Sequence, residues 1–262
     1  FAGPFGRSAY GTEEGLRALT AEEVRADHAR RFRPGGTILA VAGAFRWDEL
    51  SDTVDRIFGD WKGSAPPPPA PVGGEQPRYL HVPVESAQEH IGLAYRAVPL
   101  GHPDYYVARL AIEVLSGGMS ARLFTEVREK RGLCYAVRAL YQTVKGSGYV
   151  MAYAGTTPER CDETLRVLVG EIRRLAEGIS EEELERARTG LLSALILQSE
   201  ATRPRALFDA RDAYLLGRVR TIEEIRTQVK EVTRERLLDY LRRHPPRDLT
   251  IVTLGPRELE VV

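Results

Sequence analysis

Cysteine, long apolar runs and excess charge are all scarce in this chain of 262 residues. Its two cysteines, Cys134 and Cys161, form no CxxC pair and no metal-ligand spacing, so both are predicted to be buried thiols in a reducing compartment. No stretch of about eighteen apolar residues occurs, which excludes a membrane-spanning helix. The formal net charge is zero, so no surface for nucleic acid or anionic lipid is expected. The sequence therefore predicts a soluble protein without nucleic-acid or membrane partners, and the free thiols favour the cytoplasm.

Motifs for common catalytic chemistry are also missing. No GxSxG, P-loop or GxGxxG motif occurs in a usable context. A zinc site on one helix needs two histidines at i and i+4 beside a carboxylate, and no histidine has such a partner. We interpret all five as surface or hydrogen-bonded core residues: His28, His81, His90, His102 and His244. This chain is therefore expected to bind no cofactor or metal of its own.

A segment rich in proline and glycine divides the chain. Residues 62–78 read KGSAPPPPAPVGGEQPR, and the four consecutive prolines favour an extended polyproline conformation that spans about 40 Å. Such a composition cannot build a packed core. We predict a linker at 62–78, with the C-terminal part of one domain at 1–61 and a complete second domain at 79–262.

Hydrophobic periodicity and capping residues predict the elements on either side of the linker. Before it we expect a capped helix from Thr20 to Phe32, a buried strand at Thr37–Ala44 and a helix with apolar positions from Leu50 to Trp61. After it the pattern predicts strands at about 79–84 and 88–97, a helix at 104–115, a short charged helix, a strand hairpin, further helices opened at Thr157, Ser180 and Thr221, and a last strand, DLTIVTLG.

Two distant stretches share one layout. LTAEEVRADHARRFRPGGTILAVAG and VTRERLLDYLRRHPPRDLTIVTLG each contain a capped helix, an arginine-rich end, a proline break and an apolar strand. Thr20 corresponds to Thr233 and Thr37 to Thr250, both at an offset of 213 residues. A period this long indicates duplicated domains rather than a solenoid. We therefore expect a tandem whose first copy is truncated, with any targeting signal outside the sequence.

The segment SGGMSARLFTEVREKRGLCYAV, residues 116–137, holds the candidate site. Its charged helix is predicted to start at Ser120 and to end at Gly132, where an apolar strand follows. One stripe of the helix is expected to be buried, with Leu123, Phe124 and Val127. The other is expected to be solvated, with Arg122, Glu126 and Glu129. Two i,i+4 ion pairs are expected on the solvated stripe, Arg122–Glu126 and Glu126–Lys130.

Arg128 belongs to neither stripe. On a helical wheel it lies at the edge of the buried face, from which its side chain can reach over the strand. In that strand Tyr135 is expected to share a face with Leu133, Val137 and Ala139. Arg128 and Tyr135 could thus converge as two hydrogen-bond donors. Spacing alone leaves open the alternative of a cation at the C-terminal end of a helix dipole and a packed core tyrosine.

The segment GGMSARLFTEVREKRGLCYAV, with YAGTTPE after it, resembles the arginine/tyrosine segment of the pitrilysin–insulinase zinc metallopeptidases, in particular the bacterial processing-peptidase-like branch. The stretch GRSAYGTEEGLRALTAEEV, together with HARRFRPGGTILAVAG, resembles the second half of that family's N-terminal domain. The resemblance covers essentially the whole chain. It implies an α+β fold built from tandem homologous domains, in which helices pack on a sheet rich in antiparallel strands.

The resemblance also implies that two domains supply different parts of the active site. In the family, zinc sits on an inverted HxxEH helix of the first domain, and the glutamate of that motif activates the zinc-bound water. A second domain, in the same chain or a partner subunit, contributes an arginine and a tyrosine, which the match places at Arg128 and Tyr135. The resemblance implies that both bind the substrate carbonyl and steady the oxyanion, and that the peptide substrate adds as a strand to the zinc domain.

Residues 1–262 contain no HxxEH motif, so zinc is expected in an N-terminal segment or in a partner subunit. Three interpretations stay open. The chain is the substrate-binding part of a single-chain zinc metalloendopeptidase that acts on peptides or unfolded polypeptides, or it is a zinc-less subunit of a homo- or heterodimer with a zinc-bearing partner. The third is a non-catalytic relative that acts in assembly, like the core subunits of respiratory complexes. In each case the chain alone is expected to be inactive.

Overall fold

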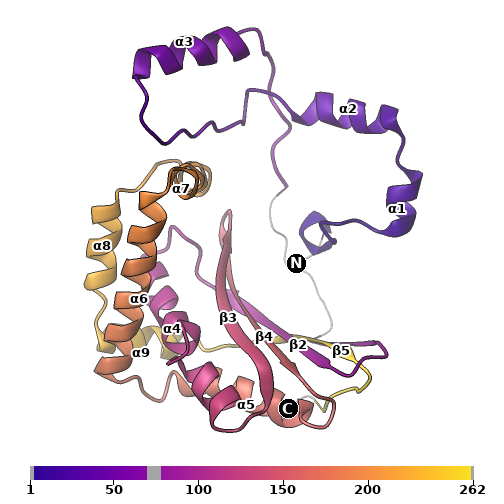
Figure 1. The fold of residues 1–262 in the computed structure, drawn as a ribbon, viewed down its shortest axis with the longest axis vertical. Coiled ribbons are helices and arrows are strands. Elements are labelled where there is room, and N and C mark those ends of the chain that lie inside the picture. Colours follow the sequence, from indigo (N-terminus) through magenta and orange to yellow (C-terminus); the bar gives the residue numbers. More distant parts are fainter. Residues whose placement is uncertain (1–2, 70–77, 261–262) are drawn as a thin grey trace. The chain divides into compact units, whose positions relative to one another are not determined.

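The computed structural model describes residues 3–69 and 78–260, which fall into two units (Figure 1). The first unit comprises Phe1–Glu75 and Ser199–Val219, and the second comprises Gln76–Gln198 and Arg220–Val262. Residues 70–77 of the predicted linker lie outside the described residues.

The first unit is helical and has little interior. Its described residues form a short 3₁₀ helix and four α-helices: η1 (Gly3–Gly6), α1 (Glu13–Ala18), α2 (Ala21–Arg31), α3 (Trp47–Phe58) and α7 (Thr202–Leu216). The predicted capping box at the start of α2 is confirmed, since the Thr20 hydroxyl accepts the Glu23 N–H and the Glu23 carboxylate accepts the Thr20 N–H. Between residues 3 and 69 no side chain is buried.

The predicted buried strand at Thr37–Ala44 is wrong. The segment has no strand structure, and the side chains of Ile38 and Leu39 are 42% and 58% exposed. A strand needs a neighbouring strand for its N–H and C=O groups, and the described residues of the first unit form no strand that could pair with it. Nearby, only Gly35 and Ser64 make an isolated bridge in the described residues.

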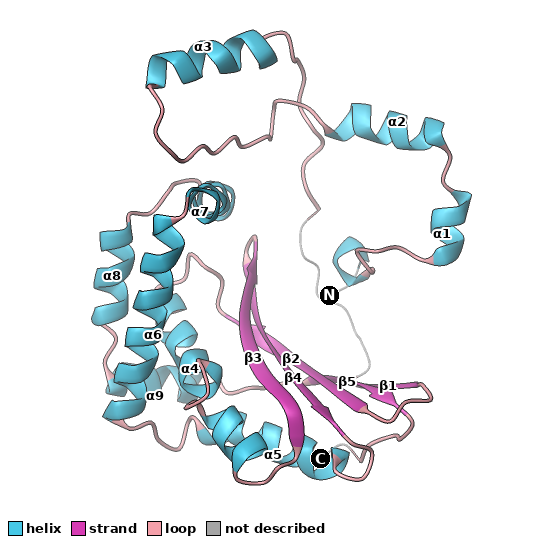
Figure 2. Cartoon of the chain, viewed as in Figure 1, coloured by secondary structure: helices cyan, strands magenta, loops and turns pink. Residues whose placement is uncertain are grey.

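The second unit is built on a five-stranded sheet in the order β1-β5-β2-β4-β3 (Figure 2). Its strands are β1 (Tyr79–Pro83), β2 (Glu89–Ala97), β3 (Cys134–Val144), β4 (Ser147–Thr156) and β5 (Thr250–Gly255). Only β1 and β5 run parallel, and the other three neighbouring pairs are antiparallel. These strands, including the predicted hairpin β3–β4, confirm an α+β fold with a sheet rich in antiparallel strands.

Helices of this unit cover one side of the sheet (Figure 2). They are α4 (Tyr105–Ser116), α5 (Cys161–Arg174), most of α6 (Glu181–Glu200), α8 (Ile222–Lys230) and α9 (Arg234–Arg243). Alternate residues of β5 are buried, as expected of a strand with one covered side. The core lies between these helices and the sheet, where Ile91, Leu110 and Leu168 are fully buried.

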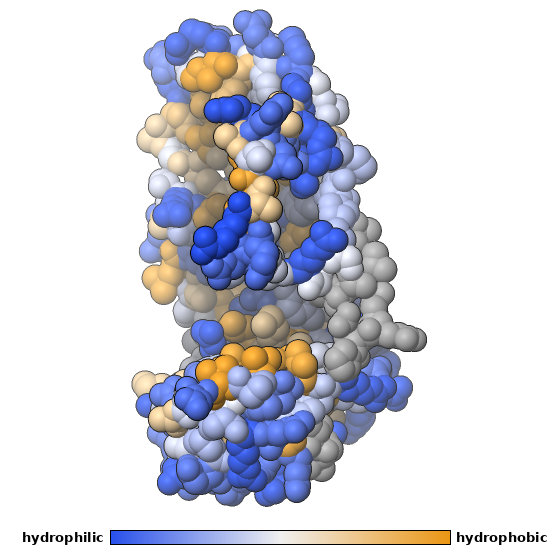
Figure 3. All heavy atoms as spheres, turned by 90° about the vertical axis from the view of Figure 1, so that its right-hand side faces the viewer, coloured by the Kyte–Doolittle hydropathy of each residue, from blue (hydrophilic) through white to orange (hydrophobic). Residues whose placement is uncertain are grey.

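Apolar side chains also remain at the surface (Figure 3). In the second unit several of them lie on the uncovered side of the sheet: Leu80, Val82, Leu140, Met151, Val252 and Leu254. Among the helices that the structure describes, none is both long and apolar enough to cross a membrane.

Candidate functional site

The candidate segment opens with a π-helix, η2 (Phe124–Glu129), rather than an ordinary α-helix. The N–H of Lys130 donates to the Thr125 carbonyl five residues earlier, over 2.9 Å. Leu123 and Val127 are fully buried, as predicted, whereas Phe124 is only half-buried. The turn ends at Gly132, whose φ of 59° lies in the left-handed region that favours glycine. Because π-helical turns are rare and are frequent at functional sites, this geometry supports the choice of the segment as the candidate site.

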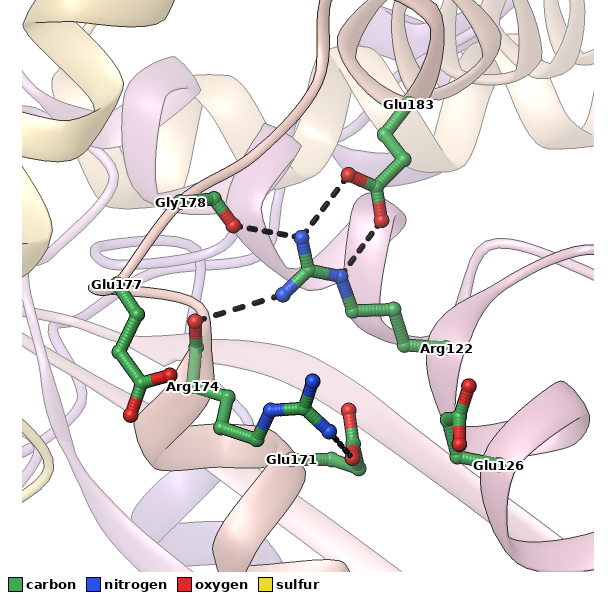
Figure 4. A pocket seen from close by; sticks show the side chains of 7 residues that line it. All are labelled: Arg122, Glu126, Glu171, Arg174, Glu177, Gly178 and Glu183. Atoms are coloured by element: carbon green, nitrogen blue, oxygen red, sulfur yellow. Dashed lines mark hydrogen bonds and ion pairs between the residues drawn. The ribbon is translucent and has the colours of Figure 1, made fainter.

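Arg122 is not on a solvated stripe, so that prediction is wrong. Its guanidinium forms two bonds to the Glu183 carboxylate, of 2.6 and 2.9 Å, and a third of 2.7 Å to the Gly178 carbonyl (Figure 4). Glu183 lies 61 residues away, at the start of α6, so no local pattern could predict the pair. Glu126 therefore does not pair with Arg122. It binds Lys130 at 2.6 Å, as predicted.

A polar cavity of about 400 Å³ surrounds Arg122 (Figure 4). Two guanidinium groups and four carboxylates line it, and both guanidinium groups are paired, Arg122 with Glu183 and Arg174 with Glu171 at 2.8 Å. Hydrogen bonding from Arg122 is the main cause that lowers the pKa of Glu183 to about 2. Glu183 also completes a capping box with Ser180. The Arg122–Glu183 pair, which we call the clamp, thus ties the residues just before η2 to the start of α6.

Arg128 lies on the exposed side of η2. Its guanidinium carbon is 4.9 Å from the centre of the Phe124 ring, so the side chain is stacked on an aromatic face. No carboxylate pairs with Arg128 among the residues that the structure describes. Burial raises the pKa of the nearby Cys134 thiol, and the positive charge of Arg128 partly offsets this rise. Arg128 is therefore a charged donor that is available to a ligand.

Tyr135 stands at a β-bulge. The register between β3 and β4 shifts between Cys134 and Ala136, which leaves Tyr135 as the extra residue of β3. Its side chain is 43% exposed, whereas Leu133 and Ala139 are buried, so the prediction that these residues share a face is wrong. The bulge is the physical reason, because an extra residue interrupts the alternation of side chains along a strand.

The Tyr135 hydroxyl donates a hydrogen bond of 2.6 Å to Oε1 of Gln88. Burial, and next the neighbouring Tyr153 hydroxyl, raise the pKa of Tyr135. Tyr135 therefore stays protonated at neutral pH and keeps a proton to donate. The sequence gives no signal for Gln88, because it meets Tyr135 only once β2 and β3 are in the same sheet.

Arg128 and Tyr135 lie at the same end of β3 but are not bonded to each other. Arg128 acts on Cys134, which is the residue directly before Tyr135. The contacts of the described residues include none between the two side chains themselves.

The described residues show no cluster of metal ligands. In residues 3–69 and 78–260, no group of three or more histidine, cysteine, aspartate and glutamate side chains is placed to hold a metal ion. His90 and Tyr153 contact each other, with 2.8 Å between Nδ1 and the hydroxyl oxygen. His81 contacts the Thr253 hydroxyl at 2.9 Å. The described residues therefore do not fit a zinc ion.

Comparison with known proteins identifies the relatives of this chain. A family model described as "Peptidase M16 inactive domain" matches residues 18–191. The uncharacterized zinc protease YmxG of Bacillus subtilis is 28% identical over 94% of this chain and 60% of its own length. An uncharacterized zinc protease of Mycobacterium bovis is 30% identical over 97% of this chain and 59% of its own length. The chain thus spans about six-tenths of the length of these curated relatives.

Solved structures share the fold. A peptidase M16 inactive domain from Pseudomonas fluorescens superposes with a TM-score of 0.87 at 23% identity, over 99% of this chain and 63% of that chain. A protease from Helicobacter pylori gives a TM-score of 0.83 at 18% identity, over 94% and 62% of the two chains. A chain of complex III2 from Candida albicans gives 0.80 at 20% identity, over 95% and 62%.

Proposed function

The chain belongs to the peptidase M16 family through that family's inactive domain, and from this premise we propose that it is the substrate-binding part of a zinc metalloendopeptidase. In this proposal the zinc is held elsewhere, by another segment of the same protein or by a partner subunit. The substrate is a peptide or an unfolded polypeptide. Arg128 and Tyr135 are the residues of this chain that touch its scissile carbonyl.

The proposal assigns one task to each donor. The Tyr135 hydroxyl exchanges its bond to Gln88 for a bond to the carbonyl oxygen of the substrate. The Arg128 guanidinium, which is stacked on Phe124 and exposed, offers a second N–H to the same oxygen. As the carbonyl carbon becomes tetrahedral, negative charge develops on that oxygen, and fixed donors stabilise it more strongly than they stabilise the ground state.

One observation carries the proposal. Tyr135 is held at a bulge with its hydroxyl on the uncovered side of the sheet, at the end of β3 that follows Arg128. A tyrosine that served only the core would be buried, as Tyr141 is, with its hydroxyl on the Val98 carbonyl. The curated relatives are called zinc proteases, which supports the proposed activity of the whole protein.

The test is peptide turnover by the chain together with the zinc-bearing part, for Tyr135→Phe and Arg128→Lys. Loss of the tyrosine hydroxyl should lower turnover by about 10²–10³-fold, which is typical of removing one oxyanion donor. Arg128→Lys keeps the charge and loses the forked donor geometry, so a smaller loss of about tenfold or more is expected. The melting temperature should stay nearly constant in both variants, because Tyr135 and Arg128 are exposed.

Tyr149→Phe is the matched control. Tyr149 is on β4, on the same side of the sheet as Tyr153 and opposite Gln142, so it is a sheet tyrosine outside the proposed site. Its replacement should leave turnover unchanged. Full turnover in both Tyr135→Phe and Arg128→Lys would contradict the proposal. It would favour instead a zinc-less subunit that acts in assembly.

A further inference from the structure

The ring of Tyr135 lies directly on the backbone of a glycine. Gly155 of β4 is paired with His90 of β2 on one side and with Ala136 of β3 on the other. A methyl group on Gly155 would lie 2.5 Å from the Tyr135 Oη and 2.6 Å from its Cζ. No real side chain tolerates such distances, so Tyr135 can cross β4 toward Gln88 only because residue 155 has no side chain.

A second pair of residues stands beside the hydroxyl. Tyr153, two positions before Gly155 on β4, places its hydroxyl 2.8 Å from Nδ1 of His90. The two rings are stacked with centroids 6.0 Å apart, and the guanidinium carbon of Arg138 lies 5.9 Å from the Tyr153 ring. Tyr153 is also close enough to Tyr135 to contribute to the raised pKa of the Tyr135 hydroxyl. The orientation of Tyr153 is therefore fixed by contacts with His90 on β2 and Arg138 on β3.

We propose that Gly155 leaves the space in which the Tyr135 ring lies against β4, and we call this position of the ring on Gly155 the seat. We propose further that Tyr153, oriented by His90, fixes the position of the Tyr135 hydroxyl. Gly155, Tyr153 and His90 are positioning residues that act through Tyr135. This inference rests on the proposed function, because the hydroxyl matters for turnover only if it binds the substrate oxygen. Its geometric part, the seat itself, can be tested without any substrate.

The test uses Gly155→Ala in the complete chain. The backbone φ of Gly155 is outside the left-handed region, so alanine is allowed there, and the atoms that it meets belong to the movable end of a tyrosine side chain. The ring should therefore swing off β4 while the sheet persists. With tyrosine labelled at Cζ, the Tyr135 carbon signal should shift and its titration midpoint should fall, because the hydroxyl leaves Gln88 and Tyr153 for water.

Gly92→Ala is the matched control. Gly92 lies on β2 opposite Tyr153, on the same side of the sheet, and a methyl group there would meet only the Val252 carbonyl at an ordinary 3.5 Å. This variant should leave the Tyr135 signal unmoved. Should Gly155→Ala fail to fold, Tyr153→Phe tests the same inference, since it keeps the ring and removes only the hydroxyl beside Tyr135. An unmoved Tyr135 signal in folded Gly155→Ala would overturn the role of Gly155, and an unmoved signal in Tyr153→Phe would overturn the role of Tyr153.

Turnover with the zinc-bearing part supplies the second readout. Gly155→Ala should lose about as much turnover as Tyr135→Phe, and the double variant should lose no more than either single one, because all three changes remove the same hydroxyl from the site. If Gly155→Ala displaces Tyr135 and still has full turnover, while Tyr135→Phe loses turnover, then the positioning role of Gly155 is overturned. Full turnover in Tyr135→Phe would overturn the proposed function and leave the seat to be judged by the Tyr135 signal.

Discussion

Residues 20–44 and residues 233–255 share one layout of capped helix and apolar segment, and they lie in different units. In the second unit the layout becomes helix α9 and strand β5, which pairs with β1 and β2. In the first unit the helix α2 forms, but the apolar segment at 37–44 has no strand structure. The helical half of the layout is thus shared, and the strand half differs.

The difference separates local from non-local structure. A helix cap is complete within four residues, and both caps are made with the same bond of 3.2 Å, from Glu23 N–H to Thr20 and from Arg236 N–H to Thr233. A strand is complete only when other strands lie beside it. Buried side chains on α9, such as Leu237, then join the core, whereas α2 has none.

Hydrogen exchange gives the largest expected contrast between the two copies. Amides of β5 that bond to β1 and β2 should exchange at least about 10³-fold more slowly than free peptides, because they open only with the sheet. Amides at 37–44 should exchange nearly at the free-peptide rate in this chain. Peptide-level exchange mass spectrometry measures both at once. Strong protection at 37–44 would mean that the segment does form a paired strand.

Arginine pairs in the two units should differ next. The Arg122–Glu183 pair has side chains that are 17% and 20% exposed, so Arg122→Met should destabilise the second unit by about 2–3 kcal/mol, somewhat less than for a fully buried pair. The Arg17–Glu13 pair of the first unit is 77% and 72% exposed, and Arg17→Met should cost at most about 0.5 kcal/mol. Urea unfolding followed by far-UV circular dichroism measures both. Equal effects would refute the role of the clamp.

Acid should weaken the same clamp. The pKa of Glu183 is lowered to about 2 in the folded state, mainly by Arg122, whereas an unfolded glutamate titrates near about 4.3. The pair therefore stabilises the fold fully above that unfolded value and loses its contribution as the pH falls toward 2. Glu183→Gln should flatten this part of the stability profile. A profile unchanged by the substitution would exclude Glu183 as a source of acid sensitivity.

The caps should give the smallest contrast. Thr233→Ala should lower the free energy of unfolding of the second unit by about 1 kcal/mol, because α9 is part of the core. Thr20→Ala removes the same bond, but α2 buries no side chain, so only the exchange rates within α2 should rise. A global loss from Thr20→Ala would show that α2 is tied to a core after all.

The predictability of the fold follows the same division. The five strands of the second unit and most of its helices could be predicted, because hydrophobic period and caps act locally, whereas α7 (Thr202–Leu216) was not predicted. The strand at 37–44 could not be judged by its pattern alone, since pairing decides it. The helix that the pattern starts at Thr157 begins instead at Cys161. The assignment of Ser199–Val219 to the first unit has no signal in the local sequence.

The site divides in a similar way. Arg128 and Tyr135 could be proposed from the family-like segment that contains them, but the β-bulge that exposes Tyr135 appears only when β3 meets β4. The partner of Arg122 is distant in sequence for the same reason. Gly155 had a signal, because a glycine inside a strand pattern often marks a close approach of another group. What the pattern could not supply is which group approaches.

The most direct test of the account is the binding of a peptide phosphonamidate, a tetrahedral mimic of the transition state, to the chain with its zinc-bearing part. If Tyr135 donates to the developing oxyanion, Tyr135→Phe should raise the inhibition constant of this mimic by about 10²–10³-fold, in parallel with its loss of turnover, while KM for the peptide changes little. An inhibition constant equal to that of the unaltered protein would contradict the account, because Tyr135 would then make no bond that is special to the transition state.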